Sequence, residues 1–356
     1  MSARAWVDDR VPTDLLHLDV AGAGRVSRQV VEAEVAHLRR EAEEGAYVAE
    51  AAAELGDGRE ALAAQAGLRG DDLFLTESAA AAFAQLLDAW PLPPGARVGT
   101  LPGQFGGHAR LLADRARRLG WVLVDLPVDA LGRVLDVPAG LDLVTLPHVP
   151  SHRGVEQPVR RVLGAGVPVL LDVAQSLGQV EVPEGAAAYV GTSRKWLCGP
   201  RGVGFGVVDP AWQPRLAEPV TLRHAEEQGM ARYDSSEAHV AGRAGLAVAA
   251  RTWSPALLPV LQAAAQAARV VLEGAGGWRV VEPLEEPTGI TTLAHDAADP
   301  AAVRDALLAE RVLVGLVPAH RAAELAGPLL RVSTAAWVTP PDLERVAEAL
   351  ARCTPR

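Results

Sequence analysis

The chain has 356 residues, of which 49% are hydrophobic and 22% are charged, and its formal net charge is −10. This balance suits a globular protein with one large or two smaller domains, and the acidic charge argues against nucleic acid or an anionic membrane as a partner. The N-terminus lacks the apolar core of a signal peptide, and no uninterrupted apolar stretch is long enough to span a bilayer. We therefore expect a cytoplasmic protein.

Cysteine and histidine usage gives no sign of a disulfide framework or a structural metal. The two cysteines, Cys198 and Cys353, are too few for either. His148 and His152 have the spacing of a metal-ligand pair, but the prolines around them exclude the helix that would place both on one face. We predict separate loop histidines and no bound metal.

The first predicted helix runs from about Ser27 to Leu38, and Ser27 is suited to be its N-cap. From residue 72 onward, short apolar runs alternate with helical stretches. The predicted strands cover residues 72–76, 97–101, 121–126, 142–146, 167–171, 187–191 and 203–208, with helices over 78–90 and 107–119. This alternation predicts an α/β fold with a mostly parallel, seven-stranded sheet that is covered on both faces.

The pattern changes after about Pro210. A long helical stretch over residues 238–273 is followed by predicted strands at 278–281, 289–293 and 329–333, with a helix at 299–310. These elements indicate a smaller α+β domain in the C-terminal part of the chain.

Near the N-terminus, residues 15–19 and the following Gly22-Ala23-Gly24 imitate the strand and glycine turn of a dinucleotide site. Ser27 stands where the third glycine of that fingerprint is needed, and the glutamates about 20 residues further on lie inside a predicted helix. We therefore do not expect nicotinamide binding here.

Lys195 is the only lysine among the 34 lysine and arginine residues of the chain. An ε-amine can form an imine with an aldehyde, whereas a guanidinium cannot act as an amine nucleophile. The alternative is a stray surface lysine in an arginine-biased chain. The residues around Lys195 distinguish a nucleophilic lysine from a stray surface lysine.

Asp172 comes directly after the predicted strand 167–171, at the edge of a parallel sheet where ligands collect. A buried carboxylate there needs a cationic partner, and a protonated pyridine nitrogen is such a partner. Asp172 could also simply cap the next turn. As a partner for a ring nitrogen, it would let the ring act as an electron sink.

Two further segments are suited to hold a phosphate. Residues 76–80 join a strand to a helix, so the first amides of that helix would point at an anion. Thr192 and Arg194 flank Lys195 and can add a hydroxyl and a guanidinium. Together with Lys195 and Asp172, they predict an amine, a ring-nitrogen partner and an anion pocket in one site.

Residues 172–178 and 193–204 resemble the pyridoxal-phosphate signature of the class V aminotransferases, a family that includes cysteine desulfurases, selenocysteine lyases and kynureninases. The resemblance covers nearly the whole chain. Segments at 16–19, 37–47, 151–154, 193–197 and 277–283 resemble the members that cleave hercynylcysteine sulfoxide in ergothioneine biosynthesis. The resemblance implies fold type I, pyridoxal 5′-phosphate as cofactor, an amino-acid substrate and a homodimer with active sites at the interface.

The same resemblance implies that the chain is divided into three segments with different roles. Residues 1–45 would contribute to the small domain and the substrate site, and residues 46–235 would form the large cofactor-binding α/β domain. Residues 236–356 would contain the long helix and the small α+β domain.

The resemblance assigns roles to residues around the cofactor ring. Lys195 would bind the cofactor aldehyde as an imine, and Asp172 would pair with the pyridine nitrogen. Gln175 would lie near the phenolic oxygen, where Ser151 replaces the asparagine of many relatives. Phe105 would stack on the ring, where relatives have a histidine or another aromatic residue. Because Phe105 cannot donate a proton as a histidine can, acid–base work would fall more heavily on Lys195.

The phosphate is implied to bind among five residues: Ser78, Ala79, Ala80, Thr192 and Arg194. Some nearby positions depart from the family pattern. Ala80 replaces a residue that often donates a side-chain hydrogen bond, and Glu77 adds a negative charge. Glu237 stands where relatives often have a threonine that reaches across the dimer. The helix N-terminus and Arg194 could compensate for these changes.

Three residues are implied to bind the substrate. Arg331 matches the arginine that takes the substrate α-carboxylate, a task that suits its bidentate fork. Tyr47 is a candidate wall for a trimethylammonium group, or simply a helix-packing residue. Arg153 could hold a betaine carboxylate or the sulfoxide oxygen, or it could be solvated.

The expected reaction follows from the position of the cysteines. Desulfurases carry a cysteine nucleophile shortly before the carboxylate arginine, but residues 312–330 contain no cysteine, and neither Cys198 nor Cys353 fits that place. We therefore expect carbon–sulfur bond cleavage by β-elimination, which gives pyruvate, ammonia and a sulfenate that an external thiol reduces. The alternatives are another enzyme of the same family (a transaminase, a selenocysteine lyase or a cysteine desulfurase-like enzyme) and a non-catalytic binding protein of the same fold.

Overall fold

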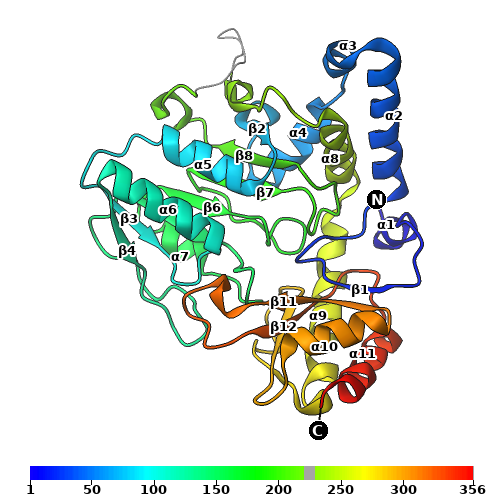
Figure 1. The fold of residues 1–356 in the computed structure, drawn as a ribbon. Helices are drawn as coiled ribbons and strands as arrows, with labels where there is room; N and C mark the ends of the chain where they lie inside the picture. The colour runs from blue at the N-terminus through cyan, green and yellow to red at the C-terminus, as the bar shows by residue number, and fades with distance from the viewer. Residues whose placement is uncertain (220–228, 356) are drawn as a thin grey trace.

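Seven strands form the central sheet of the structure, a computed structural model that describes residues 1–219 and 229–355 (Figure 1). Their order across the sheet is β2-β8-β7-β6-β5-β3-β4. The strands are Leu73–Thr76 (β2), Arg97–Thr100 (β3), Val122–Asp125 (β4), Leu143–Pro147 (β5), Val169–Asp172 (β6), Ala188–Thr192 (β7) and Gly204–Val208 (β8). β8 runs antiparallel to both neighbours, and the other neighbouring strands are parallel. The predicted α/β fold with a mostly parallel sheet is confirmed.

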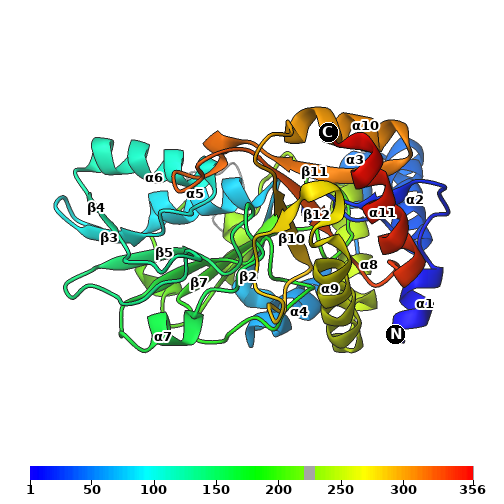
Figure 2. The same ribbon diagram turned by 90° about the horizontal axis from the view of Figure 1, so that it is seen from below.

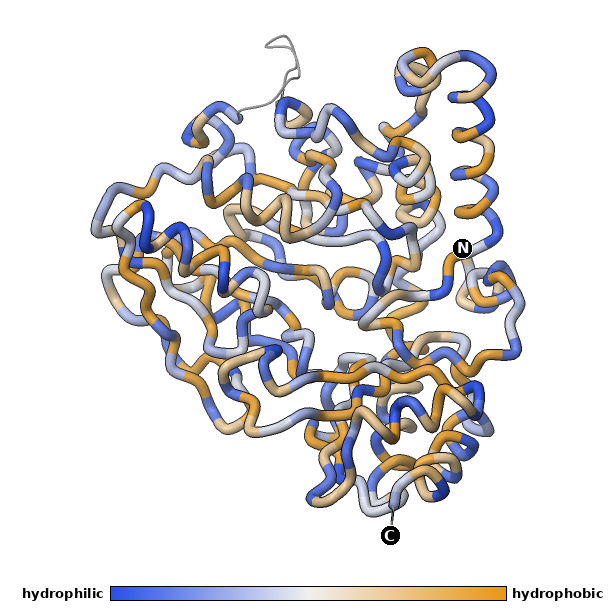
Figure 3. The backbone as a smooth tube through the Cα atoms, in the orientation of Figure 1, coloured by the Kyte–Doolittle hydropathy of each residue, from blue (hydrophilic) through white to orange (hydrophobic). Residues whose placement is uncertain are grey.

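The central strands are apolar on both faces because helices cover both faces. Leu170 packs with helices α5 (Ala79–Ala89) and α6 (Gly106–Leu119), whereas the adjacent Leu171 packs on the opposite face. The second face is covered by α4 (Gly56–Ala63), α7 (Val159–Leu163) and α8 (Val240–Thr252). Figure 3 shows the resulting hydrophobic interior along these strands. Successive side chains of a strand point to opposite faces of the sheet, so a parallel sheet with helices on both faces needs apolar residues at every position.

A second sheet of five strands has the order β1-β11-β12-β10-β9. Its strands are Leu16–Leu18 (β1), Arg279–Val280 (β9), Ile290–Ala294 (β10), Val312–Val317 (β11) and Leu329–Ser333 (β12). Helices α9 (Leu258–Leu272), α10 (Pro300–Ala309) and α11 (Pro340–Cys353) belong to the same hydrophobic core. β1 pairs in parallel with β11, so the N-terminal segment is part of the C-terminal sheet. We call the seven-stranded sheet with its helices the large domain, and the five-stranded sheet with its helices the small domain. The boundaries expected from the sequence stay a prediction, and residues 220–228 lie outside the described residues.

Helix α2 (Arg28–Glu44) begins where the sequence predicts a helix. The Ser27 hydroxyl accepts a hydrogen bond from the Val30 amide at 3.1 Å, so Ser27 is the N-cap. Two short helices, α1 (Ala3–Asp8) and α3 (Ala46–Ala51), lie on either side of α2 in the chain. Along α2 only Val30 and His37 are buried, so most of the helix surface is available for solvent or a partner.

The predicted helix over 238–273 is divided into α8 and α9. Trp253 and Ser254 leave the helical conformation before Pro255, and the Ser254 hydroxyl caps the next turn by accepting from the Ala256 amide. A proline inside a helix removes a backbone hydrogen bond and disfavours helical geometry in the residue before it, which explains the break.

By length and composition alone, Pro255–Leu272 could cross a membrane, which differs from the expectation that no such segment exists. In the structure this segment packs on the small domain. Its buried Arg269 donates hydrogen bonds of 2.6 Å to the carbonyl oxygens of Glu286 and Thr288. A buried guanidinium bonded to backbone carbonyls shows that this face of the helix packs against the rest of the protein.

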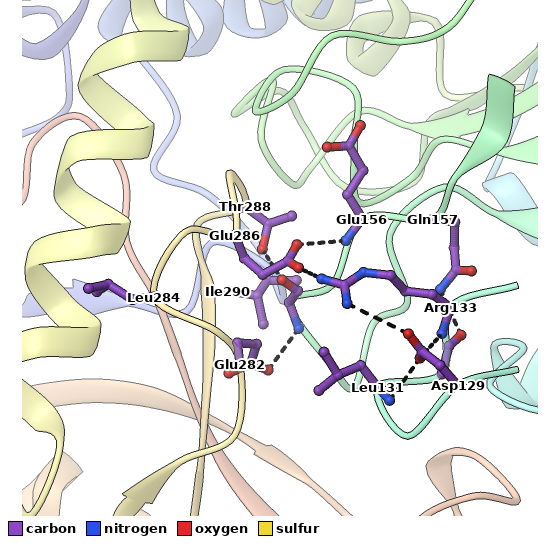
Figure 4. A network of polar contacts seen from close by, with 12 residues as sticks. Asp129, Leu131, Arg133, Glu156, Gln157, Glu282, Leu284, Glu286, Thr288 and Ile290 are labelled. Carbon is purple, nitrogen blue, oxygen red and sulfur yellow. Dashed lines mark hydrogen bonds and ion pairs between the residues drawn. The ribbon is translucent and has the colours of Figure 1, made fainter. Parts of the chain in front are cut away.

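Polar contacts join loops of the large domain to the small domain (Figure 4). Arg133 forms an ion pair with Glu286, and Glu286 also accepts from the Glu156 amide at 3.1 Å. Glu282 accepts from the Gly154 amide at 2.8 Å. Because these carboxylates satisfy buried backbone donors, they fix the loop over residues 151–157 against the small sheet.

Candidate active site

A cavity of about 320 Å³ lies at the carboxyl ends of the central strands. Its lining includes every residue that the sequence predicts for cofactor binding, together with the predicted carboxylate arginine: Ser78, Ala79, Ala80, Phe105, Ser151, Asp172, Gln175, Thr192, Arg194, Lys195 and Arg331. Residues that are far apart in the sequence thus meet at the edge where parallel sheets bind ligands. The volume is in the range of sites for small molecules.

Lys195 lies in the turn that follows β7, and its amine is enclosed among charged groups of the cavity. Burial is the main cause that lowers the pKa of Lys195 to about 7, and the Asp172 carboxylate opposes this effect. The guanidinium groups of Arg194, Arg331 and Arg321 lower the pKa further. A neutral, nucleophilic amine is therefore available near neutral pH.

Asp172 ends β6 with its side chain buried at the cavity. Its Oδ1 accepts a 2.8 Å hydrogen bond from the Ala174 amide, and its Oδ2 lies 3.2 Å from His108 Nδ1, although this pair is not aligned for a straight hydrogen bond. Burial raises the pKa of Asp172, but His108 and Lys195 outweigh it, so the net direction is downward. The His108 ring is itself stacked on Phe83 at 4.0 Å. An ionised carboxylate is therefore fixed at the cavity, where it can pair with a cationic group of a ligand.

The first turn of α5 faces the cavity. Ser78 is its N-cap and accepts from the Ala81 amide at 3.1 Å. The amides of Ala79 and Ala80 belong to the first helical turn, which has no partners within the helix. This end of α5 is thus suited to a phosphate, although Glu77 also lines the cavity and adds a negative charge.

Arg194 and Thr192 lie on the other side of the same region. The Thr192 hydroxyl donates to the Val203 carbonyl oxygen at 3.3 Å, which fixes its position at the end of β7. Burial is the main cause that lowers the pKa of Arg194, and Arg201 adds to it. Among the described residues, no carboxylate forms an ion pair with Arg194. Its positive charge is therefore free to pair with a bound anion.

Gln175 is held by hydrogen bonds on both sides of its amide. Its Nε2 donates to the Ala21 carbonyl oxygen at 3.0 Å, and its Oε1 accepts from the Trp196 indole at 2.9 Å. One amide hydrogen is left for a ligand. The buried Ser151 hydroxyl has no partner among the described residues, so it too can bind a polar ligand atom.

Arg331 extends from β12 with its guanidinium buried. It donates to the Ser151 carbonyl oxygen at 2.8 Å and to Asp19 Oδ1 at 2.9 Å. Its Nε has no partner among the described residues. These two bonds fix the guanidinium in one orientation, and a substrate carboxylate would bind the remaining edge or displace Asp19.

Tyr47 and Arg153 do not line this cavity. Tyr47 is 77% exposed on α3. Arg153 is not solvated: it donates to the Ala130 carbonyl oxygen at 3.3 Å and lies 3.7 Å from Glu324. Their roles in substrate binding stay predictions, because within a single protomer neither side chain lines the cavity.

Several residues of the lining were not predicted from the sequence, among them His108, Ala21, Gly22 and Arg321. His108 lies one helical turn after Phe105, so helical periodicity could have indicated it. Ala21 and Gly22 belong to the segment that imitates a dinucleotide site. Arg321 lies on the loop between β11 and β12, where no local motif indicates a role.

The predicted loop histidines have separate partners: His148 contacts Glu156, and His152 contacts Glu324.

No protein-family model matches the chain. Solved structures with the same fold include the apo cysteine desulfurase from Thermococcus onnurineus NA1, with a TM-score of 0.86 and 16% identity over 99% of this chain and 98% of that one. The cystine C-S lyase C-DES in complex with cysteine persulfide has a TM-score of 0.85 and 17% identity over 96% of this chain and 99% of that one. A C-DES variant with glycine covalently linked to its PLP cofactor has a TM-score of 0.84 and 16% identity, and covers 95% of this chain and 97% of that one. These likenesses show fold type I.

The sequence of a "Probable hercynylcysteine sulfoxide lyase" from Mycobacterium tuberculosis (strain CDC 1551 / Oshkosh) is 38% identical to the chain. The alignment covers 99% of the chain and 93% of that relative. The chain belongs to the hercynylcysteine sulfoxide lyase family. This family lies within the class V aminotransferases, and the chain is a pyridoxal-phosphate-dependent carbon–sulfur lyase.

The residues of the lyase fit its cofactor. The cavity combines an amine of lowered pKa on Lys195 with a buried carboxylate on Asp172. A helix N-terminus and the Arg194 guanidinium lie beside them in the lining, and the Ser151 hydroxyl is buried without a partner among the described residues. We propose that Lys195 binds the aldehyde, that Asp172 binds the ring nitrogen, and that α5 and Arg194 bind the phosphate.

The titration of Lys195 can be measured directly because the lyase has a single lysine. We expect labelling of the cofactor-free protein by trinitrobenzenesulfonate to be half-maximal at a pH of about 7. Below that pH the amine is protonated and unreactive, and above it the amine is neutral. Mass spectrometry distinguishes the Lys195 peptide from the N-terminal peptide. Half-maximal labelling near the ordinary lysine value of 10.5 would contradict the proposed environment.

Gly24 supports the turn that carries Lys195. Its amide donates to the Arg194 carbonyl oxygen at 2.7 Å, and a Cβ atom here would lie 2.5 Å from both the Lys195 carbonyl oxygen and Cys198 Sγ. Gly24→Ala is therefore expected to displace this turn, lower the stability by about 1–3 kcal/mol and weaken cofactor binding. Thermal unfolding and cofactor titration measure both effects.

The matched control is Gly56→Ala, because a Cβ atom at Gly56 has no neighbour within 4 Å. Unchanged cofactor affinity in Gly24→Ala would show that the close approach is not needed.

Proposed function

We propose that the lyase cleaves hercynylcysteine sulfoxide by β-elimination. The observation that carries the proposal is the 38% identity to a probable hercynylcysteine sulfoxide lyase over 99% of the chain. The cavity supports it, because an amine, a ring-nitrogen partner and a carboxylate-binding arginine line one site.

In the proposed reaction, the substrate loses its Cα proton and its Cβ–S bond breaks, which gives a sulfenic acid and aminoacrylate. Water converts aminoacrylate into pyruvate and ammonia. Two external thiols reduce the sulfenic acid to the thiol level, which gives ergothioneine, a disulfide and water. A sulfenate is a better leaving group than a simple thiolate, so the sulfoxide favours this cleavage.

Bound pyridoxal phosphate supplies an electron sink for the electrons of the Cα–H bond. Lys195 is then the group that takes the Cα proton, because its pKa of about 7 gives a substantial fraction of neutral amine near pH 7. Arg331 orients the substrate through the α-carboxylate, and Asp172 keeps the ring nitrogen protonated. Phe105 lines the cavity and cannot exchange protons, so it leaves this work to Lys195.

The positions of the cysteines argue against the desulfurase alternative, which the fold alone allows. Neither Cys198 nor Cys353 lines the cavity. Burial is the main cause that raises the pKa of Cys198 to about 11, so its thiol is protonated and a poor nucleophile. Persulfide formation on this chain would need a cysteine that the described active site does not have.

We also propose that the lyase is a homodimer. Three apolar side chains follow one face of α2 at helical spacing, Val31, Val35 and Leu38, with exposures of 38%, 38% and 47%. Tyr47 and Val48 extend this exposed apolar stripe onto α3. Leu38→Glu is expected to shift the protein toward monomer in analytical ultracentrifugation, and an unchanged mass would argue against this face as the interface.

The need for a thiol reductant supports a cytoplasmic location for the reaction, because thiols are kept reduced there. We propose that a free external thiol performs this step.

The test of the function is pyruvate release by the cofactor-loaded protein. We expect faster release from hercynylcysteine sulfoxide than from cysteine, selenocysteine or an amino donor paired with a keto acid. No release from the sulfoxide would reject the proposal. Sulfur or selenium release from cysteine or selenocysteine at a higher rate would favour the alternative family reactions.

A further inference from the structure

The loop over residues 318–328, between β11 and β12, forms one side of the active-site cavity. Figures 1 and 2 both show it reaching from the small domain toward α6. Its backbone packs closely on the start of α6, because a Cβ atom on Gly106 would lie 3.3 Å from the Arg321 carbonyl oxygen. Arg321 lines the cavity from this loop.

Glu324 anchors the loop to the large domain. Its Oε1 lies 2.6 Å from Nε2 of the fully buried His152 and 3.7 Å from the Arg153 guanidinium. Burial raises the pKa of Glu324, but the hydrogen bond and charge of His152 outweigh it, so the carboxylate is held ionised. A charge-assisted contact in a half-buried place fixes the loop, and with it the position of Arg321.

Arg321 brings a guanidinium into the cavity, and none of the described carboxylates pairs with it. Its central carbon lies 5.6 Å from the centroid of the Phe105 ring. Burial is the main cause that lowers the pKa of Arg321, and repulsion from Arg331 adds to it. No carboxylate among the described residues forms an ion pair with Arg321. Two guanidiniums that repel each other in a partly buried site favour the binding of further negative charge.

In the proposed function, each of the other cationic side chains of the cavity is assigned to an anionic group of the cofactor or the substrate. Arg194 and the start of α5 are assigned to the phosphate, and Arg331 is assigned to the α-carboxylate. Hercynylcysteine sulfoxide has further negative oxygens beyond its Cβ–S bond. These are the carboxylate of the histidine betaine and the sulfoxide oxygen, which becomes a sulfenate when the bond breaks.

We infer that Arg321 binds an anionic oxygen on the sulfur side of the substrate and thereby determines which sulfoxides the lyase accepts. This inference rests on the proposed function. A guanidinium fork can bind either oxygen source through charge-assisted hydrogen bonds. An uncharged side chain at this position would leave that oxygen unpaired in the cavity.

The test compares Arg321→Met with wild type in the cofactor-loaded enzyme. With hercynylcysteine sulfoxide, we expect kcat/KM to fall about ten- to a hundredfold. The spectral dissociation constant for L-alanine, which has no sulfur side, should change less than about twofold. Arg321→Lys should recover part of the activity because it keeps the charge without the fork. Arg117→Met, at an exposed arginine of α6, is the matched control and should behave like wild type.

Two further ligands distinguish the oxygen sources. S-Methylcysteine sulfoxide has the sulfoxide oxygen without the betaine carboxylate, and histidine betaine has the carboxylate without sulfur. A similar loss with S-methylcysteine sulfoxide would assign Arg321 to the sulfoxide oxygen. Weaker inhibition by histidine betaine, with no loss for S-methylcysteine sulfoxide, would assign it to the carboxylate.

The inference is overturned if Arg321→Met retains wild-type kcat/KM for all sulfoxides and binds histidine betaine like wild type. It is also overturned if L-alanine binding weakens as much as sulfoxide turnover, because Arg321 would then act on the α-carboxylate or on the fold. Failure of the proposed function is a separate result: wild-type enzyme would release no pyruvate from hercynylcysteine sulfoxide. Arg321 would then be judged on S-methylcysteine sulfoxide and histidine betaine alone.

Discussion

Replacing Lys195 with arginine is expected to reduce pyruvate release at least about a thousandfold while the protein still folds. The substitution keeps a positive charge beside Asp172, so the buried carboxylate retains a cationic neighbour. It removes the only side-chain amine in the chain, and a guanidinium with its high pKa can neither bind the cofactor aldehyde nor accept the Cα proton near pH 7. Steady-state pyruvate release and the absorbance of bound cofactor measure the two losses.

The control for Lys195→Arg must separate chemistry from folding. Circular dichroism and the thermal midpoint should be close to those of wild type. A small primary amine added to the solution should restore part of the activity, because it supplies the missing base. An active Lys195→Arg enzyme, without added amine, would refute the role of Lys195.

Replacing Asp172 with asparagine is expected to reduce pyruvate release about a hundred- to thousandfold. Asparagine can still accept the hydrogen bond from the Ala174 amide, but it carries no charge to hold a protonated ring nitrogen. The substitution also removes the charge that raises the pKa of Lys195. Half-maximal labelling of Lys195 should therefore move to a pH below about 7.

The shift of the Lys195 titration distinguishes an electrostatic role of Asp172 from a purely structural one. Asp114→Asn, in an exposed ion-pair cluster on α6, is the matched control and should leave both activity and titration unchanged. An Asp172→Asn enzyme with wild-type activity would show that the ring nitrogen needs no carboxylate partner.

The central sheet could be predicted because its strands are short apolar runs, and all of them except the edge strand β4 are largely buried. Strands such as Leu143–Pro147 and Gly204–Val208 are buried at every position and carry that pattern in their composition alone. β11 was not predicted, although it is apolar, because it follows the helix before it with hardly any turn. The break between α8 and α9 was missed as well, since alanine-rich residues continue on both sides of Pro255.

The residues predicted to bind the cofactor lie in local motifs at strand ends and helix starts, and the structure brings them together in one cavity. Lys195 and Asp172 each follow a predicted strand, and Ser78 begins a predicted helix. Arg321 and His108 could not be placed in the same way. Arg321 reaches the cavity through a loop of the small domain, and its contribution depends on how two domains pack.

The N-terminal segment shows a further limit of local patterns. Gly22-Ala23-Gly24 imitates a dinucleotide turn, yet in the structure Gly22 lines the cavity and Gly24 packs on the Lys195 turn. The small residues are needed for the close approach of two backbone segments. No pattern within residues 15–27 indicates that the partner segment lies more than a hundred residues away.

The decisive measurement is pyruvate release from hercynylcysteine sulfoxide by the wild-type, cofactor-loaded lyase in the presence of an external thiol. We predict one pyruvate and one ammonia for each ergothioneine formed, and loss of turnover in Lys195→Arg. We also predict that cysteine is a much poorer source of pyruvate. Absence of pyruvate from the sulfoxide, or equal turnover by Lys195→Arg, would contradict the proposed function.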